Sequence, residues 1–150
     1  MKPFALALVI LGTLCFAAPA SGQTTGLPSR KGVLPVQGIY TVPSGVLLYD
    51  VVRATGASTA DKADASDETK VPGIGIVVQK PDATTAVVQY VGEVKGLSSL
   101  VPGAVYFLSE IAGQITAIAP TASGAVVQRI GIAKDSTTLM LTIDPTYVVL

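Results

Sequence analysis

Short runs of apolar residues, separated by turn-forming residues, follow one another along most of this chain. Residues 37–40 and 46–53 are rich in apolar and aromatic side chains and are bracketed by proline and glycine, so both are predicted to be β-strands. Residues 74–79 and 85–91 form two further runs on either side of "KPDAT". Because proline presets a turn backbone and aspartate accepts a nearby backbone N–H, these runs are predicted to form a β-hairpin.

The same order of elements occurs twice. The stretch "PGIGIVVQKPDATTAVVQYVGEV" resembles the later "VQRIGIAKDSTTLMLTIDPTYVV", and "PSGVLLYDV" resembles "VPGAVYFLS". One such unit of strand, loop and hairpin cannot cover its own apolar face, so packing one copy against the other would build a core. We therefore expect an all-β fold, a compact β-sandwich or partly closed barrel. The β domain is expected to span residues 43–150, with similar units at 43–95 and 101–150.

Two glycines recur at matching places in this repeat. Gly75 and Gly131 each lie between two isoleucines. A glycine weakens a strand unless a bulge or a close backbone approach requires the missing Cβ. The recurrence favours such a close approach at both positions.

The most polar stretch is "ASTADKADASDETKVPG", residues 57–73, which lacks the bulky residues of a buried strand. It is predicted to be a surface loop. Its carboxylates could bind calcium, since hard cations prefer oxygen ligands, although the spacing is not that of an EF-hand and nearby lysines partly neutralise the cluster. The candidate ligands are Asp61, Asp64, Asp67 and Glu68.

Charge and composition limit the partners and the kinds of catalytic or metal site that the chain can have. The 150 residues fit one domain, with 10 basic and 10 acidic side chains and no basic run, so neither a nucleic acid nor an anionic membrane surface is an expected partner. The chain has no histidine and no tryptophan, and its one cysteine is Cys15 near the N-terminus. These absences remove the usual general base, thiol nucleophile and transition-metal ligands, so we expect neither an enzyme nor a cofactor.

The N-terminus resembles a secretory signal. Lys2 precedes an apolar run, and the small residues of "APASGQ" follow it. We expect residues 1–22 to be a signal peptide, with an uncleaved anchor and a lipoprotein signal at Cys15 as alternatives. The mature chain is then secreted, extracellular or on the cell surface, has no membrane span, and begins with an extended arm at residues 23–42.

Two chain regions are candidates for contacts with other molecules. The C-terminal residues Tyr147, Val148, Val149 and Leu150 follow the last charged side chain, Asp144, and an apolar end of this kind packs on its own domain or on a neighbouring copy. Most tyrosines, among them Tyr49, Tyr90 and Tyr106, lie in apolar strands and are predicted to be core. A carbohydrate contact would therefore need Tyr40 or Tyr147.

The turn and strand "PGAVYFLS", the strand "VVQRIGIA" and the ending "LTIDPTYVVL" resemble a β module of phage and prophage virion proteins, of the tail-fibre and capsid-decoration type. The resemblance covers most of the chain after Val42. It implies a structural or adhesive role through protein–protein assembly, as a homo-oligomer and most simply a trimer, with cell-surface or virion proteins as partners. A phage-encoded chain would then be located in the virion. The alternative is a secreted monomeric module that binds carbohydrate or another cell-surface ligand.

Overall fold

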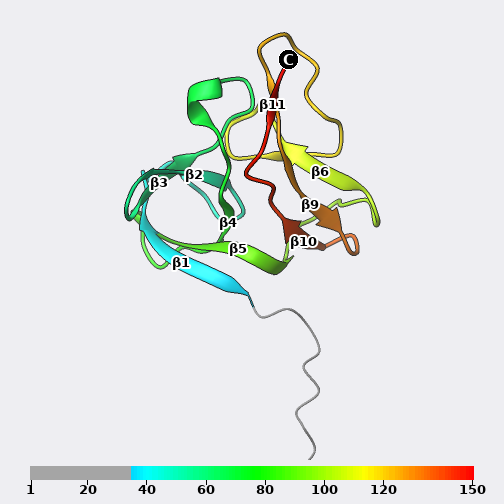
Figure 1. The fold of residues 1–150 in the computed structure, drawn as a ribbon. Coiled ribbons are helices and arrows are strands. Elements are labelled where there is room, and N and C mark those ends of the chain that lie inside the picture. The colour runs from blue at the N-terminus through cyan, green and yellow to red at the C-terminus, as the bar shows by residue number, and fades with distance from the viewer. Residues whose placement is uncertain (1–34) are drawn as a thin grey trace, which may run out of the picture.

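The computed structural model describes residues 35–150 and builds them almost entirely from β-strands (Figure 1). The expected signal peptide, residues 1–22, lies outside the described residues. The all-β prediction is confirmed, because the one helical element among residues 35–150 is a single 3-10 turn, η1 (Glu68–Lys70). The strands are β1 (Val36–Thr41), β2 (Val51–Gly56), β3 (Thr59–Lys62), β4 (Gly75–Gln79), β5 (Thr85–Lys95), β6 (Val105–Leu108), β7 (Ile115–Thr116), β8 (Val126–Val127), β9 (Arg129–Ala133), β10 (Thr138–Thr142) and β11 (Val148–Val149).

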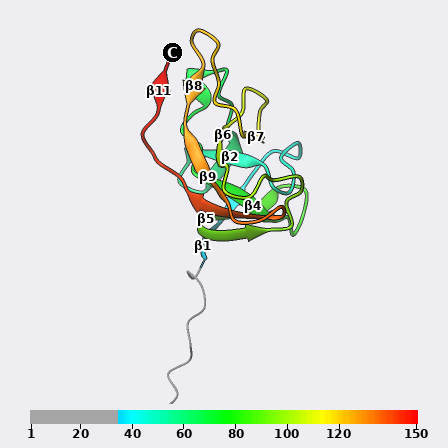
Figure 2. The same cartoon turned by 90° about the vertical axis from the view of Figure 1, so that its right-hand side faces the viewer.

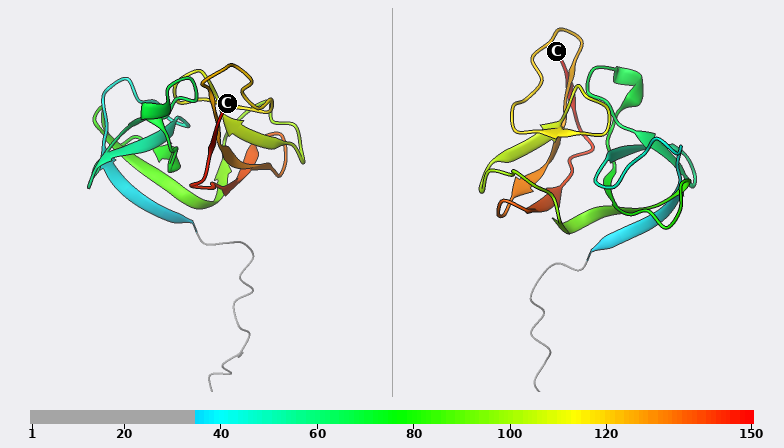
Figure 3. Two further views of the ribbon diagram at one scale, coloured as in Figure 1. Left: turned by 45° about the horizontal axis from the view of Figure 1, so that its top comes forward. Right: turned by 180° about the vertical axis from the view of Figure 1, so that it is seen from behind.

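Two lobes lie side by side and share the long strand β5 (Figure 3). The main sheet has the strand order β1-β3-β2-β4-β5-β10-β9-β6-β7, and a separate two-stranded sheet joins β11 to β8. Apart from β1, the order is symmetric about the β5–β10 pair, because β2, β3 and β4 have the counterparts β6, β7 and β9. We call residues 36–90 the first unit and residues 91–142 the second unit.

The hydrogen bonds of the two units match. In the first unit, the Tyr49 N–H donates to the Val77 carbonyl at 2.8 Å, and the Val77 N–H donates to the Asp50 carbonyl at 3.0 Å. In the second unit, Gly103 donates to Ala133 at 2.8 Å, and Ala133 donates to Ala104 at 2.9 Å. Tyr49 therefore corresponds to Gly103, and the backbone of both has positive φ, 70° and 80°.

The paired glycines lie at equivalent points of the two units. Gly75 is opposite Val52 and Gly131 is opposite Tyr106. A Cβ on Gly75 would lie 2.6 Å from the Gln89 carbonyl oxygen, and one on Gly131 would collide with the Met140 carbonyl oxygen. The close backbone approach predicted from the repeat is confirmed.

The unit boundaries differ from the predicted 43–95 and 101–150. The first unit begins with β1, which contains the strand predicted at residues 37–40 and lies within the expected arm at residues 23–42; it pairs with β5 from Thr41↔Thr85 to Val36↔Val91. The second unit begins inside β5, whose residues 91–95 pair with β10. The units begin earlier than predicted because the turn sequences, which carry the visible similarity, start later than the strands that precede them.

Two other local predictions need correction. The expected strand at residues 46–53 begins only at Val51, because residues 47–50 form a turn closed by the Asp50 N–H donating to the Leu47 carbonyl. The expected surface loop at residues 57–73 contains β3, and Ala60, Ala63 and Ala65 within it are buried. Alanines among charged residues form a polar pattern in sequence, but Ala60 packs in the interior of the first unit, and the small side chains of Ala63 and Ala65 pack with residues of the second unit. The predicted hairpin of β4 and β5 is confirmed.

The two cores differ in side-chain size. The first unit encloses valines and alanines: Val42, Val46, Val52, Ala60, Val77, Ala86 and Val88. The second core combines larger side chains, including Leu108, Ile130, Leu139 and Tyr106, with small residues from the first unit such as Val51 and Ala65.

The fully buried amide Gln128 joins the units. Its Oε1 accepts from the Gly73 N–H at 2.8 Å, and its Nε2 donates to the carbonyls of Gly73 and Asp144, both at 2.9 Å. A buried peptide group without a partner is costly, so this side chain holds the segment before β4 in place.

Candidate functional site

The C-terminal strand is the clearest candidate surface for contacts with another molecule. β11 pairs with β8 through Val148↔Val127 and Val149↔Val126, and the Leu150 N–H donates to the Ala125 carbonyl at 3.0 Å. Within residues 35–150, the other edge of β11 has no strand partner. Figure 2 shows β11 on the outside of the molecule beside β8.

Every side chain at this C-terminal end is accessible. The exposed fractions are 38% for Tyr147, 61% for Val148, 42% for Val149 and 49% for Leu150. Pairing the backbone within the chain therefore leaves the apolar side chains uncovered. Residues 147–150 thus pack on their own chain through β8, one of the two arrangements expected from the sequence, but their apolar side chains remain exposed to contact with another molecule.

Tyr40, one of the two predicted ligand contacts, is engaged with Tyr90. The Tyr90 hydroxyl donates to the Tyr40 hydroxyl at 2.8 Å, and the rings meet edge to face with centroids 6.4 Å apart. Burial, together with this hydrogen bond, raises the pKa of Tyr90 to about 12. Both rings pack against the valine and alanine core of the first unit. Tyr40 is therefore a half-buried packing residue.

Tyr147 precedes β11, whereas Tyr40 lies in β1 at the opposite end of the molecule (Figure 1). The fold does not bring the two tyrosines together. A ligand contacting one of them would not reach the other, so they do not make a joint platform.

Local hydrogen bonds occupy three of the four candidate calcium ligands. Asp61 Oδ1 accepts from the Lys62 N–H at 2.7 Å, and Asp64 Oδ1 accepts from the Ser66 N–H and hydroxyl at 2.9 and 2.6 Å. Asp67 does the same with Thr69 and caps η1, where Glu68 is exposed. The Lys70 Nζ atom lies 3.3 Å from Asp67 Oδ2 and 3.7 Å from Asp64 Oδ2. In the described part of the chain, no three acidic, histidine or cysteine side chains converge on one point.

The Asp-x-Ser/Thr pattern of Asp64 and Asp67 recurs at three further aspartates. Asp82, Asp135 and Asp144 each accept from the N–H and hydroxyl of the threonine two residues later. Hydrogen bonds from threonines lower the pKa values of all three carboxyls and that of Asp67; for Asp82 the side chain of Thr85 has the largest effect, followed by the N–H of Thr84. The aspartates therefore serve as turn caps.

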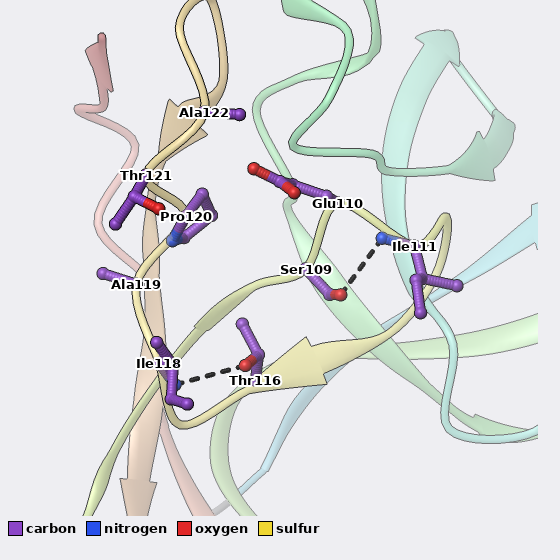
Figure 4. Close-up of a pocket in the computed structure, with 9 residues that line it drawn as sticks. All are labelled: Ser109, Glu110, Ile111, Thr116, Ile118, Ala119, Pro120, Thr121 and Ala122. Carbon is purple, nitrogen blue, oxygen red and sulfur yellow. Dashed lines mark hydrogen bonds between the residues drawn. The ribbon is translucent and has the colours of Figure 1, made fainter.

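A hollow of about 400 Å³ lies between the turn after β6 and the segment after β7 (Figure 4). The Glu110 carboxylate points into it, while Ser109 Oγ accepts from the Ile111 N–H at 3.0 Å and Thr116 Oγ1 accepts from the Ile118 N–H at 3.2 Å. Among the residues that line this hollow, Glu110 is the only ionisable one. A lone exposed carboxylate beside two engaged hydroxyls does not make an acid–base or nucleophile–base pair.

A larger cleft, of about 570 Å³, lies where the end of β5 faces the start of β7. Its lining includes Tyr49, which sequence reasoning assigned to the core together with Tyr90 and Tyr106. Tyr49 is half-buried and faces this cleft. The sequence carried no signal for this position, because the similarity of residues 43–51 to 101–109 pairs Tyr49 with Phe107, whereas the hydrogen bonds of the structure pair it with Gly103.

Comparison with models of known protein families finds no match, and comparison with curated proteins finds no similar sequence. Within residues 35–150, no helix has the length and apolar character needed to cross a membrane.

Proposed function

We propose that this chain is a non-enzymatic structural or adhesive protein that acts by assembling with copies of itself. In this proposal it works outside the cytoplasm, or in a virion, as do the phage fibre and decoration modules that its sequence resembles. The observation that carries the proposal is the C-terminal strand β11, paired on one edge and exposed along its apolar side chains.

An exposed strand edge flanked by apolar side chains is a liability for a soluble protein unless another surface covers it. Charged side chains and proline are two of the means that protect natural edge strands, and residues 147–150 have neither. The occupant we propose is a second copy of this chain. The side chains of residues 145–150 are all uncharged, so the apolar surface of one copy can pack on that of another without burying a charged side chain. The resemblance favours a trimer.

Light scattering on the purified chain tests the proposal. We expect a homo-oligomer whose mass falls toward that of the monomer in Val148→Lys, because a lysine on β11 opposes edge pairing. Ile39→Lys is the matched control, since Ile39 on β1 is 72% exposed and lies at the far end of the molecule. A monomer in the unchanged protein, or dissociation by Ile39→Lys alone, contradicts assembly through β11.

A monomeric result would favour the second candidate function, a secreted module that binds a cell-surface ligand. The observation in its favour is the cleft beside Tyr49.

A further inference from the structure

The cleft between the end of β5 and the start of β7 occupies the place of a strand pairing that only the first unit makes. In the first unit, the Thr41 N–H donates to the Ser58 carbonyl at 2.9 Å, which joins β1 to β3. In the second unit, the corresponding strands stay apart. Their gap is lined by residues 96–100 and 113–115, and by residues 48–50, which enter from the first unit.

Unusual backbone conformations gather around this cleft. In residues 35–150, Tyr49 and Ser99 are the non-glycine residues with positive φ, at 70° and 59°, and both line it. Such conformations cost about 1–3 kcal/mol each and concentrate at functional sites. At the equivalent position, Gly103 adopts the same conformation without this cost. The tyrosine side chain is therefore kept at a position that favours glycine.

The Tyr49 side chain spans the gap. A Cβ on Gly96 would collide with the Tyr49 hydroxyl, so the ring reaches across to the end of β5. Leu48, Leu97 and Ile115 supply apolar lining, and Ser98, Ser99 and Gln114 are exposed polar side chains around it. An aromatic ring, flanked by hydroxyl and amide groups, matches a ligand with both an apolar face and hydroxyls.

The one carboxylate that lines the cleft is paired within the protein. Asp50 is the ionisable carboxylate in its lining, and its Oδ2 accepts from the Leu47 N–H at 2.7 Å and lies 3.0 Å from Lys62 Nζ. The strand edge is also occupied, because the Gly113 N–H donates to the Ala63 carbonyl at 2.7 Å and its carbonyl accepts from Val51 at 2.8 Å. A peptide therefore could not extend the sheet at Gly113.

We propose that this cleft binds a neutral saccharide, which packs on the Tyr49 ring and exchanges hydrogen bonds with Ser98, Ser99 and Gln114. Its volume of about 570 Å³ lies within the range of small-ligand sites, roughly 300–1,000 Å³. The site does not include Tyr40 or Tyr147, and it is separate from β11. It therefore does not depend on self-assembly, and Val148→Lys would leave it intact.

The test is an NMR titration of the full ¹⁵N-labelled chain with maltose, cellobiose, lactose and N,N′-diacetylchitobiose, and with glucose 6-phosphate as the charged comparison. We expect saturable shifts of the Gly96, Ser99 and Gln114 amides with at least one of the neutral disaccharides. The absence of a saturable shift at these amides with all four overturns the proposal. So does equal or tighter binding of glucose 6-phosphate.

Two variants separate binding from folding. Ser99→Gly removes a hydroxyl and relieves the positive φ, so we expect binding to weaken about tenfold while stability is kept or raised. Gln114→Ala, at an exposed position, should weaken binding similarly. Ser44→Gly, which lies outside the cleft, is the matched control. Unchanged affinity in both Ser99→Gly and Gln114→Ala overturns the proposed site.

Discussion

In the first unit, β1 pairs with both β3 and β5 and closes the strands into a ring, whereas in the second unit β7 pairs with β6 alone. The hydrogen bonds around Gly75 and Gly131 are otherwise the same. Closure therefore does not follow from the shared part of the repeat. It depends on the residues that differ.

Interior side-chain size is the difference that accompanies closure. Val88 and Leu139 lie at equivalent points beside the paired glycines, and Val52 has Tyr106 as its counterpart. A closed ring of few short strands has room only for small side chains, because its diameter is set by the number of strands. Larger residues in the second unit fill a wider, open interior. The cleft beside Tyr49 is a product of that opening.

Exchanging these interior residues should produce the largest effects. Leu139→Ala leaves a cavity at a fully buried position and should lower the free energy of unfolding by about 2–5 kcal/mol. Val88→Leu should cost about 1–3 kcal/mol, because the closed ring cannot widen. Urea denaturation measures both. A stabilising Val88→Leu would contradict the idea that ring closure limits side-chain size.

The paired glycines offer a test of what the units share. Gly75→Val and Gly131→Val should each cost about 2 kcal/mol or more, since a Cβ meets a backbone carbonyl that side-chain movement cannot relieve. Gly45→Ala is the control, because a Cβ there has nothing within 4 Å. Denaturation midpoints unchanged at one glycine but not the other would show that the units are not equivalent at this point.

Opening the first unit should have a smaller effect. Thr41→Pro removes the N–H that reaches Ser58 and should cost about 1 kcal/mol, the value of one hydrogen bond. Thr41→Val retains that N–H and serves as the matched variant. Equal unfolding free energies for the two would mean that the β1–β3 contact adds nothing to stability.

The last expected effect is alkaline and confined to the first unit. Because the pKa of Tyr90 is raised from 10.0 to about 12, the protonated phenol is favoured in the folded state. Its contribution to stability is present below pH 10 and is lost as the pH rises to about 12. Tyr90→Phe should lose less stability than the unchanged chain over this interval, as followed by urea midpoints. An identical pH dependence would contradict the pKa shift.

Sequence patterns were sufficient for the local features of the fold. The hairpin of β4 and β5 and the roles of Gly75 and Gly131 could be predicted because turn chemistry and glycine placement act between near neighbours. The burial of Ala63 and Ala65 could not, since it results from contact with the other unit. Their backbone partners, Val51 and Ser109, show that this loop lies between the units.

The candidate site was less accessible to prediction. The exposed end at residues 147–150 could be picked out by its lack of charge, but the cleft joins residues 48–50, 96–100 and 113–115, which are distant in the chain. Its main residue, Tyr49, lies in an apolar run and resembles a core residue in sequence. Only its backbone conformation, set by the fold, distinguishes it.

The length of β5 has a consequence for how many units such a chain can contain. Its residues 85–90 end the first unit and its residues 91–95 start the second, so one continuous strand belongs to both units. β10 is the corresponding strand of the second unit, but it ends at Thr142. Asp144 then caps a turn, and Pro145 lacks the N–H that a longer β-ladder would need. Within residues 35–150, the shared ladder therefore ends after the second unit. Replacing that stop with five strand-forming residues would be the way to append a third.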